Sequence, residues 1–446
     1  MFNKDFIFGV STASYQIEGS IDADGKCESI WDEYTKVEGN IDDGSDGSKV
    51  CESYIKYKED VKLLKELKVN SYRFSIAWTR VITEKNKPNK KGLAYYKNLA
   101  KALVKAGIKP LATLYHWDMP LWLEKKGGFL NDEISDYFAY YTDVVTKALD
   151  GLVTDYITIN EPQCIMFLGH KVCVHAPGVE YDDKDMLHAI HNLLLCHGKA
   201  VKVIRENVKN STIGFAPCSR PSVPTDDSVE AYHKCYDKYF ELDRDGEYPN
   251  NVSIYSDPIF LGDYPKEYYE KFKDILPNIT KEDLKLISQP VDYIYQNFYS
   301  GTYYSYKDNV LNKEKFPFGY PEGNIGWLQV VPKTLYYGPK FLYERYRKPI
   351  IISENGFCNN DVVSLDNKVH DPERIDYIRR YLLELEKVSN EIPVKGYYYW
   401  SLFDNFEWHN GLKKRFGLVY IDYQTGERIK KDSFFEFKKI IKSKKN

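Results

Sequence analysis

Two glutamates, Glu161 and Glu354, each stand at the end of a short apolar run that is typical of a buried strand. Pro162 has no N–H and disfavours the helical region for the residue before it, so the first run ends and turns at Glu161. A lone Glu-Pro would indicate a helix cap or a surface turn. Two carboxyls at one place would indicate acid–base or nucleophilic chemistry, and glycosidic bond cleavage uses such pairs, about 5–5.5 Å apart for retention and wider for inversion.

The elements that must bring the two glutamates together are eight strand-like runs with helical patterns between many of them. The runs are 6–10, 71–76, 111–115, 156–159, 213–216, 291–296, 350–353 and 396–400. Apolar stripes at spacings of three and four predict helices, for example Tyr57, Val61, Leu64 and Leu67. Strands that alternate with amphipathic helices predict a parallel sheet, and eight units in this length favour an α/β fold of the closed (β/α)8 barrel type.

Polar and aromatic residues gather where the predicted strands end. In a (β/α)8 barrel the carboxyl ends of the strands share one rim, where such enzymes do chemistry. The segments at these ends include Ser14–Gly19, 73–75, 116–118, 160–161, 297–299, 353–356 and 404–408. Trp, His, Asn, Gln and Glu on one rim suit a ligand with polar edges and apolar faces. A sugar fits that description.

The rest of the chain predicts few extra features. Residues 217–290 are longer than a plain crossover, and helix starts are expected near Tyr264 and Thr280. Asp371 and Pro372 are typical of an N-cap and a first helical position. A lysine-rich amphipathic helix is expected after Asp432, with its lysines in solvent. Without a Ser/Gly- or Pro-rich linker, residues 1–446 are predicted to form a single (β/α)8 catalytic domain with long βα loops.

Composition excludes several classes of protein. A net charge of -3 gives no hint of a nucleic-acid or membrane partner. The N-terminal residues lack a signal-peptide pattern, and no apolar stretch is long enough to span a bilayer. The eight cysteines are scattered without a Cys-x-x-Cys pair, so we expect reduced thiols and a cytoplasmic location.

Several segments resemble the signature motifs of glycoside hydrolase family 1. They include TINEP at 158–162, ISENG at 352–356, TASYQIEG at 12–19, RFSIAW at 73–78, HWD at 116–118 and RFGL at 415–418. The match follows the family's order from Phe8 to about Asp422. The resemblance implies a retaining glycosidase on a (β/α)8 barrel, without metal or organic cofactor.

The resemblance also implies roles for the rim residues. Glu354 matches the nucleophile and Glu161 the acid/base, while Arg73 and Tyr299 match positions that hydrogen-bond the nucleophile. Matches to sugar-binding positions are Gln16, His116, Asn160, Asn297, Trp400, Glu407 and Trp408. Asn160 is expected at the sugar 2-hydroxyl. Taken singly, a buried His or Trp is more often a core residue than a ligand, and only the set of motifs favours function.

The sequence departs from its relatives at a few positions that bear on the substrate. Members that cleave 6-phosphorylated sugars share a Ser, a Lys and a Tyr after strand eight. The matching residues of this chain are Glu407, Lys414 and Phe416, so only the lysine is present. A carboxylate would repel a phosphate, and Lys414 is expected as a solvated surface charge. Gln163 replaces the usual Trp, and Gln163 and Trp327 are expected to face the leaving group.

The hypothesis that follows is a retaining β-glucosidase acting on terminal β-D-glucosyl groups of cello-oligosaccharides or other small β-glucosides. Acceptance of β-galactosides or β-fucosides, and assembly as a homo-oligomer, stay open. The alternatives are a 6-phospho-β-glucosidase and a sugar-binding relative that has lost catalysis. A non-catalytic relative would be expected to lack one of the two glutamates, and this chain has both.

Overall fold

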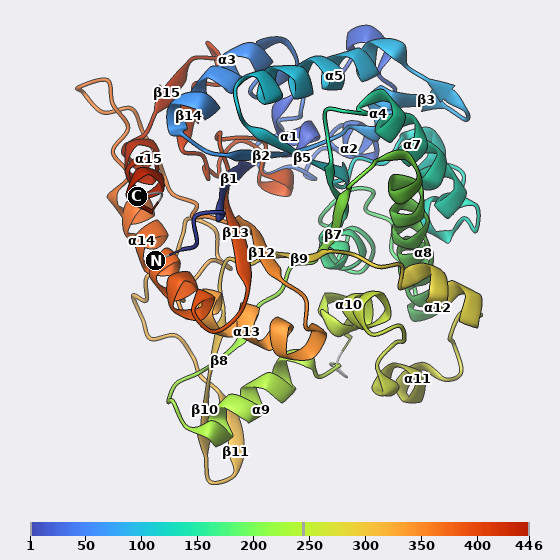
Figure 1. The fold of residues 1–446 in the computed structure, drawn as a ribbon, viewed down its shortest axis with the longest axis vertical. Helices are drawn as coiled ribbons and strands as arrows, with labels where there is room; N and C mark the ends of the chain where they lie inside the picture. The colour runs from blue at the N-terminus through green and yellow to red at the C-terminus, as the bar shows by residue number, and fades with distance from the viewer. Residues whose placement is uncertain (1, 243–245, 445–446) are drawn as a thin grey trace.

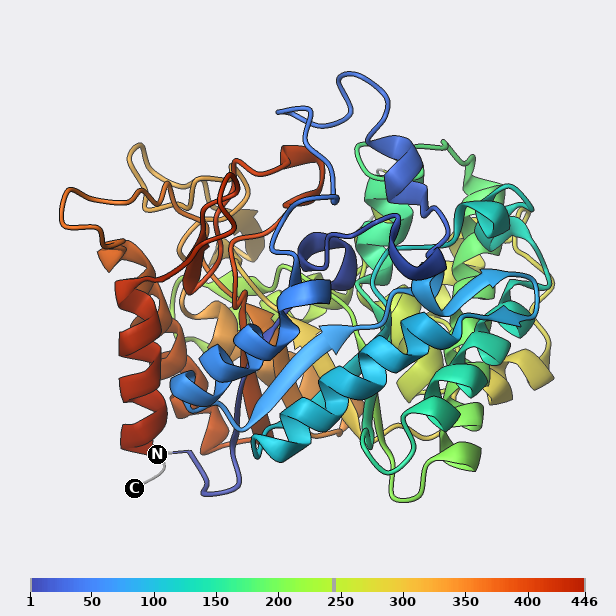
Figure 2. The same ribbon diagram turned by 90° about the horizontal axis from the view of Figure 1, so that it is seen from above.

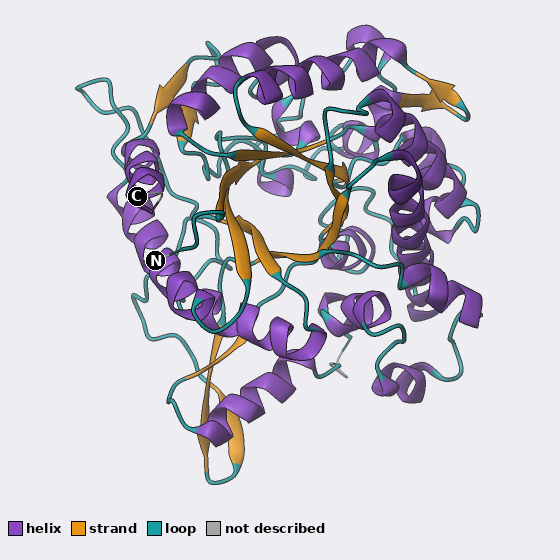
Figure 3. Cartoon of the chain, in the orientation of Figure 1, coloured by secondary structure: helices purple, strands orange, loops and turns teal. Residues whose placement is uncertain are grey.

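In a computed structural model, which describes residues 2–242 and 246–444, eight parallel strands close into a barrel. Figures 1 and 3 look into this ring of strands, with helices packed around it. The strand order around the barrel is β1-β13-β12-β9-β7-β6-β5-β2. The strands are β1 (Ile7–Ser11), β2 (Ser71–Ser75), β5 (Lys109–Tyr115), β6 (Asp155–Asn160), β7 (Thr212–Ala216), β9 (Tyr293–Asn297), β12 (Ile350–Asn355) and β13 (Val394–Trp400). The predicted barrel is confirmed, and each predicted run overlaps one barrel strand.

The strands are buried on both faces, as the near-continuous apolar runs predict for a parallel sheet. Because side chains alternate along a strand, one set faces the helices and joins the main core. The other set fills the barrel interior as a smaller cluster of Leu111, Ile157, Ala216, Tyr295, Ile351 and Tyr398. A Cβ at Gly214 would lie 2.3 Å from the ring of Tyr295, so this position needs a glycine.

The helices surround the barrel and complete the βα units (Figure 1). The longer ones are α3 (Ser53–Leu67), α5 (Lys90–Lys105), α7 (Ile134–Ala148), α8 (Asp183–Asn207), α13 (Thr334–Tyr346) and α14 (Pro372–Ser389). Shorter helices lie in the loops: α1 (Ser14–Ile17), α2 (Ile30–Tyr34), α4 (Trp78–Val81) and α6 (Leu121–Glu124). In α3 the predicted stripe is correct, with Val61, Leu64 and Leu67 buried.

The long segment after β7 does contain extra helices. They are α9 (Val229–Phe240), α10 (Ser253–Phe260), α11 (Lys266–Phe272) and α12 (Lys281–Ile287). Thr280 caps α12 in a capping box with Asp283, which explains the predicted start there. Strands β8 (Ser222–Pro224), β10 (Thr302–Lys307) and β11 (Val310–Lys313) form a small sheet outside the barrel, beside α9 in Figure 1.

The last helix of the chain packs on the outside of the barrel, against its first strand. The predicted C-terminal helix is α15 (Asp432–Lys444), which lies near the N-terminus in Figures 1 and 2. Phe437 of α15 packs edge-on against Phe8, with ring centroids 6.4 Å apart. Asp371 stands before α14 as predicted, but its side chain does not cap the helix. It binds Arg374 and Ser433 instead, because the buried guanidinium is a stronger partner than a backbone N–H.

Long loops cover one end of the barrel, at the top of Figure 2, and the chain also forms two small hairpins. The hairpins are β3 (Ile82–Glu84) with β4 (Lys87–Pro88), and β14 (Val419–Ile421) with β15 (Arg428–Lys430). Among the described residues, none of the helices combines the length and the apolar character needed to cross a membrane.

Candidate active site

Glu161 directly follows β6 and is buried, with 7% of its surface exposed. Its backbone has a φ of 46°, a left-handed conformation that is rare outside glycine. The N–H of Glu161 donates to the carbonyl of Ala216 at the end of β7, 2.7 Å away. The strand therefore stops and turns at the residue before Pro162, as predicted. Such strain costs about 1–3 kcal/mol and is characteristic of functional sites.

Glu354 lies within β12 and is held by two strong donors. Arg73 of β2 donates from Nη1 to Glu354 Oε1 over 2.7 Å, and the hydroxyl of Tyr299 donates to Oε2 over 2.6 Å. Arg73 is 1% exposed, so this ion pair is screened from water. Gly356, two residues on, passes the carbonyl of Trp400 so closely that a Cβ would lie 1.7 Å from that oxygen. Arg73 and Tyr299 together therefore fix the orientation of the Glu354 carboxylate.

A chain of hydrogen bonds joins the two glutamates. Arg73 Nη2 donates to Asn160 Oδ1, which also accepts from Asn297 Nδ2 at 3.1 Å. The same Asn297 nitrogen donates to Glu161 Oε1 over 2.7 Å. Because the Oδ1 of Asn160 accepts from two donors, the orientation of its amide is fixed. Glu161 and Glu354 therefore stand in one site, linked through Arg73 and through the asparagines that end β6 and β9.

The two glutamates differ in how firmly they hold a proton. Burial, and then the charge of Glu354, raises the pKa of Glu161 to about 7. Burial also raises the pKa of Glu354, but Arg73 and Tyr299 oppose that rise. Glu161 receives its shortest hydrogen bond from the neutral amide of Asn297. The pair can therefore hold one proton on Glu161 while Glu354 is charged.

Three of the predicted sugar-binding residues have buried polar atoms without a partner among the described residues. They are Oε1 of Gln16, Nδ1 of His116 and Oε2 of Glu407. The amide nitrogen of Gln16 donates to the carbonyl of Phe406 over 2.8 Å, which leaves its oxygen as a free acceptor. An unsatisfied buried polar group costs about 1–3 kcal/mol, so these atoms are suited to the hydroxyls of a ligand.

His116 is neutral, because burial and then the nearby Arg73 hold the pKa of its imidazole well below the usual range. Its Nε2 faces the amide nitrogen of Asn160 at 3.2 Å, and that nitrogen can only donate. The proton of His116 is therefore on Nδ1, where it can be donated to a ligand. Burial, followed by the charges of Glu354 and Glu161, raises the pKa of Glu407 to about 8.

Aromatic rings form one wall of the site. The imidazole of His116 is nearly parallel to the rings of Trp400 and Trp408, with centroids 5.8 and 6.0 Å away. Trp117 packs against Trp408 at 4.5 Å and donates from its indole nitrogen to the carbonyl of Asn160 over 2.9 Å. Trp117 thus holds the turn that carries Glu161, a role that the sequence did not single out. Indole faces of this kind stack well on the C–H faces of sugars.

The two residues predicted to face the leaving group lie in different surroundings. Trp327 is 42% exposed and meets the ring of Tyr299 edge-on at 5.5 Å, so it stands at the mouth near Glu354. Gln163 is buried, and its amide oxygen accepts from the N–H of Cys218. Its influence on the leaving group stays a prediction. Lys414, predicted as a solvated charge, is half-buried and reaches Asn324 Oδ1 at 3.4 Å.

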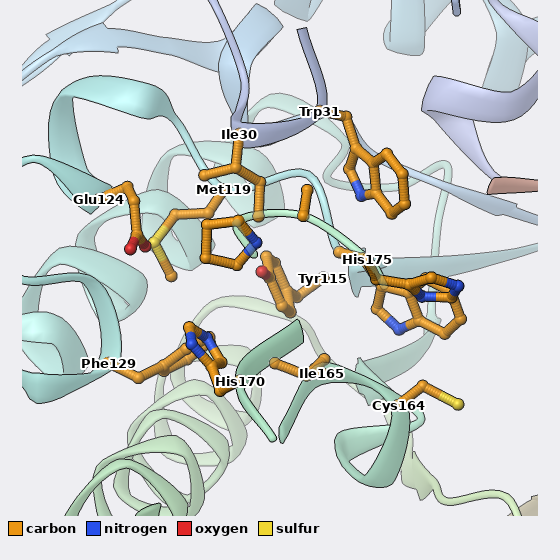
Figure 4. Close-up of a pocket in the computed structure, with 13 residues that line it drawn as sticks. Ile30, Trp31, Tyr115, Met119, Glu124, Phe129, Cys164, Ile165, His170 and His175 are labelled. Carbon is orange, nitrogen blue, oxygen red and sulfur yellow. The ribbon is translucent and has the colours of Figure 1, made fainter. Parts of the chain in front are cut away.

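The structure adds residues beside Glu161 that the sequence did not indicate. Cys164 donates from its thiol to Glu161 Oε2 over 3.1 Å. The feature of the sequence that could have indicated this contact is the position of Cys164 three residues after Glu161. A cavity next to the site is lined by Trp117, Cys164 and His175, and Figure 4 shows Cys164 at its edge. In that view the thiol of Cys164 points away from the other side chains that line the cavity.

The barrel and the linked carboxyls define a glycosidase-type site, and comparisons with known proteins agree. The model of glycosyl hydrolase family 1 matches residues 1–446. The chain is 39% identical to beta-glucosidase A of Thermotoga maritima, with 99% of this chain and 98% of that protein covered. It is 40% identical to beta-glucosidase A of Acetivibrio thermocellus, with the same coverage.

Solved structures give the same result. The beta-glucosidase from Thermotoga maritima in complex with glucoimidazole superposes with a TM-score of 0.90 at 39% identity, covering 99% of this chain and 98% of that one. The chain therefore belongs to glycosyl hydrolase family 1. It is a retaining glycoside hydrolase, as the signature motifs predicted.

Proposed function

We propose that the protein is a retaining β-glucosidase in which Glu354 is the nucleophile and Glu161 is the acid/base. The observation that carries this assignment is the unequal surroundings of the two carboxyls. Glu354 is bound by a guanidinium and a phenol, at 2.7 and 2.6 Å, which favour its charged form. Glu161 is bound mainly by a neutral amide, and its pKa is raised to about 7.

The reaction follows from this division. Glu354 attacks the anomeric carbon while Glu161 gives its proton to the leaving oxygen, which yields a glycosyl ester on Glu354. Esterification removes the charge of Glu354, which had raised the pKa of Glu161. The pKa of Glu161 then falls, so its carboxylate can take a proton from the water that attacks the anomeric carbon, and the bond from that carbon to Glu354 breaks to release the carboxylate. Two displacements at the same carbon restore the original configuration.

A free glucoside suits the sugar-binding residues better than a phosphorylated one. The two relatives compared above bear the name beta-glucosidase A. A phosphate dianion would meet the charged carboxylate of Glu354, and at Glu407 a carboxyl that supplies no positive charge to bind it. Phe416, at the position where phosphate-binding relatives have Tyr, is buried and has no hydroxyl. Lys414 is the feature that would favour the phosphate.

Glu354→Gly tests the assignment. The variant should lose hydrolysis of an aryl β-glucoside, and azide should restore turnover with release of the α-glucosyl azide, because the small anion takes the place of the carboxylate. Glu52→Gly, which changes a half-exposed glutamate elsewhere, is the control and should keep its activity. A loss that azide does not restore would contradict the nucleophile assignment. Faster hydrolysis of the aryl glucoside 6-phosphate than of the glucoside would contradict the proposed substrate.

A further inference from the structure

Two free cysteines stand beside Glu161. The sulfur of Cys164 lies 3.7 Å from that of Cys218 and 3.1 Å from Oε2 of Glu161. One ligand atom from each of the three residues falls within 4.8 Å of the other two. Cys164 opens the short π-helix Cys164–Leu168 that follows β6, and Cys218 follows β7. Because β6 and β7 are parallel neighbours, their turns bring the two thiols to one place.

The spacing of the three atoms suits a metal ion with tetrahedral coordination. Zinc–sulfur bonds of about 2.3 Å place two sulfurs of a tetrahedral site about 3.8 Å apart. The observed distance between Cys164 and Cys218 is 3.7 Å. A carboxylate oxygen at about 2.1 Å from zinc would lie about 3.6 Å from each sulfur, so Glu161 needs only a small movement from 3.1 Å.

The chemistry of the donors selects soft cations. Two thiolates and a carboxylate bind zinc or cadmium well, whereas magnesium prefers oxygen ligands alone. Both cysteines are half-buried, and Figure 4 shows that the Cys164 thiol points away from the adjoining cavity. The hydrogen bond with Cys218, and burial, raise the pKa of the Cys164 thiol well above its usual range. A metal ion must therefore displace protons from the thiols as it binds.

We propose that Glu161, Cys164 and Cys218 form an inhibitory binding site for a soft divalent cation. One cation binds two thiols and the carboxyl, with release of their protons and no change of oxidation state. The cation then occupies the place of the proton on Glu161. The expected inhibition rests on the acid/base role proposed above for Glu161. Binding of the cation to the two sulfurs does not depend on that role. Binding and inhibition can therefore be measured separately.

The experiment is a titration of the reduced protein with cadmium chloride. Thiolate-to-cadmium charge transfer in the ultraviolet reports binding, and hydrolysis of an aryl β-glucoside reports inhibition. We expect both signals to rise together and EDTA to reverse them, while magnesium chloride should give neither. In Cys218→Ser the absorbance should fall, and the cadmium concentration for half-inhibition should rise at least tenfold. Cys173→Ser, which removes a half-buried thiol outside the cluster, should behave as the wild type.

Several results would overturn the proposal. If Cys218→Ser were inhibited at the same cadmium concentration as the wild type, the two sulfurs would not be the site. If cadmium bound at the sulfurs while hydrolysis continued, Glu161 would not be a ligand. If the protein hydrolysed no aryl glucoside, the proposed function would fail, but the absorbance of the wild type and Cys218→Ser would still decide whether the metal site exists.

Discussion

Tyr299→Phe removes the phenol hydroxyl that donates to Glu354 Oε2 over 2.6 Å and changes little else. The backbone at Tyr299 is held by the hydroxyls of Tyr377 and Tyr381, which both donate to its carbonyl. The phenylalanine ring should therefore stay against Trp327. The lost bond stabilised the charged form of Glu354, so the pKa of Glu354 rises in the variant.

The size of the effect follows from the type of hydrogen bond. A hydrogen bond to a charged group contributes about 1.5–3 kcal/mol. Since 1.36 kcal/mol corresponds to a factor of ten, kcat/KM on the acidic limb should fall about 10- to 150-fold. The loss should shrink as the pH rises, because the nucleophile ionises again. The acidic limb of the profile therefore moves to higher pH.

The assay is kcat/KM for an aryl β-glucoside across the pH range, since this ratio reports the ionisation of the free enzyme. Tyr377→Phe is the matched control, because its hydroxyl binds the backbone of Tyr299 and not Glu354. The control should keep the acidic limb in place. A loss in Tyr299→Phe that is equal at all pH values, or an acidic limb that moves to lower pH, would show that Tyr299 does not act by stabilising the charged form of Glu354.

Three further predictions concern the acid/base and the stability of the fold. Glu161→Ala should slow glucosides with poor leaving groups far more than activated aryl glucosides, and equal losses in kcat/KM would count against its role as acid. In the wild type, kcat/KM should fall as the pH rises through about 7, where Glu161 loses the proton that it must donate; a rate that stays level to pH 9 would contradict this. Lys431→Met should lower the free energy of unfolding by about 3–5 kcal/mol in urea denaturation, because it leaves buried charges on Asp361 and Asp404 less compensated. Lys430→Met, at a half-exposed pair, should cost at most about 1 kcal/mol, and equal costs would contradict the argument.

The barrel was predictable because each of its strands is a short buried run that can be recognised locally. The grouping of the polar residues on one rim could be predicted from the barrel, since the carboxyl ends of parallel strands share one edge. His116, Asn160 and Asn297 could therefore be placed together from the sequence, although nothing local shows that Asn297 donates to Glu161.

Features that depend on side-chain packing were not predictable. The pairing of Cys164 with Cys218 joins residues 54 apart in the chain, and no pattern in either segment indicates it. Asp371 has the local features of a helix cap, but the buried Arg374 competes for its carboxylate. Lys414 is flanked by charges and was expected in solvent, yet a contact with Asn324 holds it partly buried.

In the proposed mechanism Glu354 forms a covalent bond to the sugar. Incubation with an aryl 2-deoxy-2-fluoro-β-glucoside that has a good leaving group, followed by mass spectrometry of the peptides, measures this directly. We expect one 2-fluoroglucosyl group per chain, on Glu354, and no label in Glu354→Gln. A label on Glu161 or on another residue, or hydrolysis of β-glucosides without any label, would contradict it.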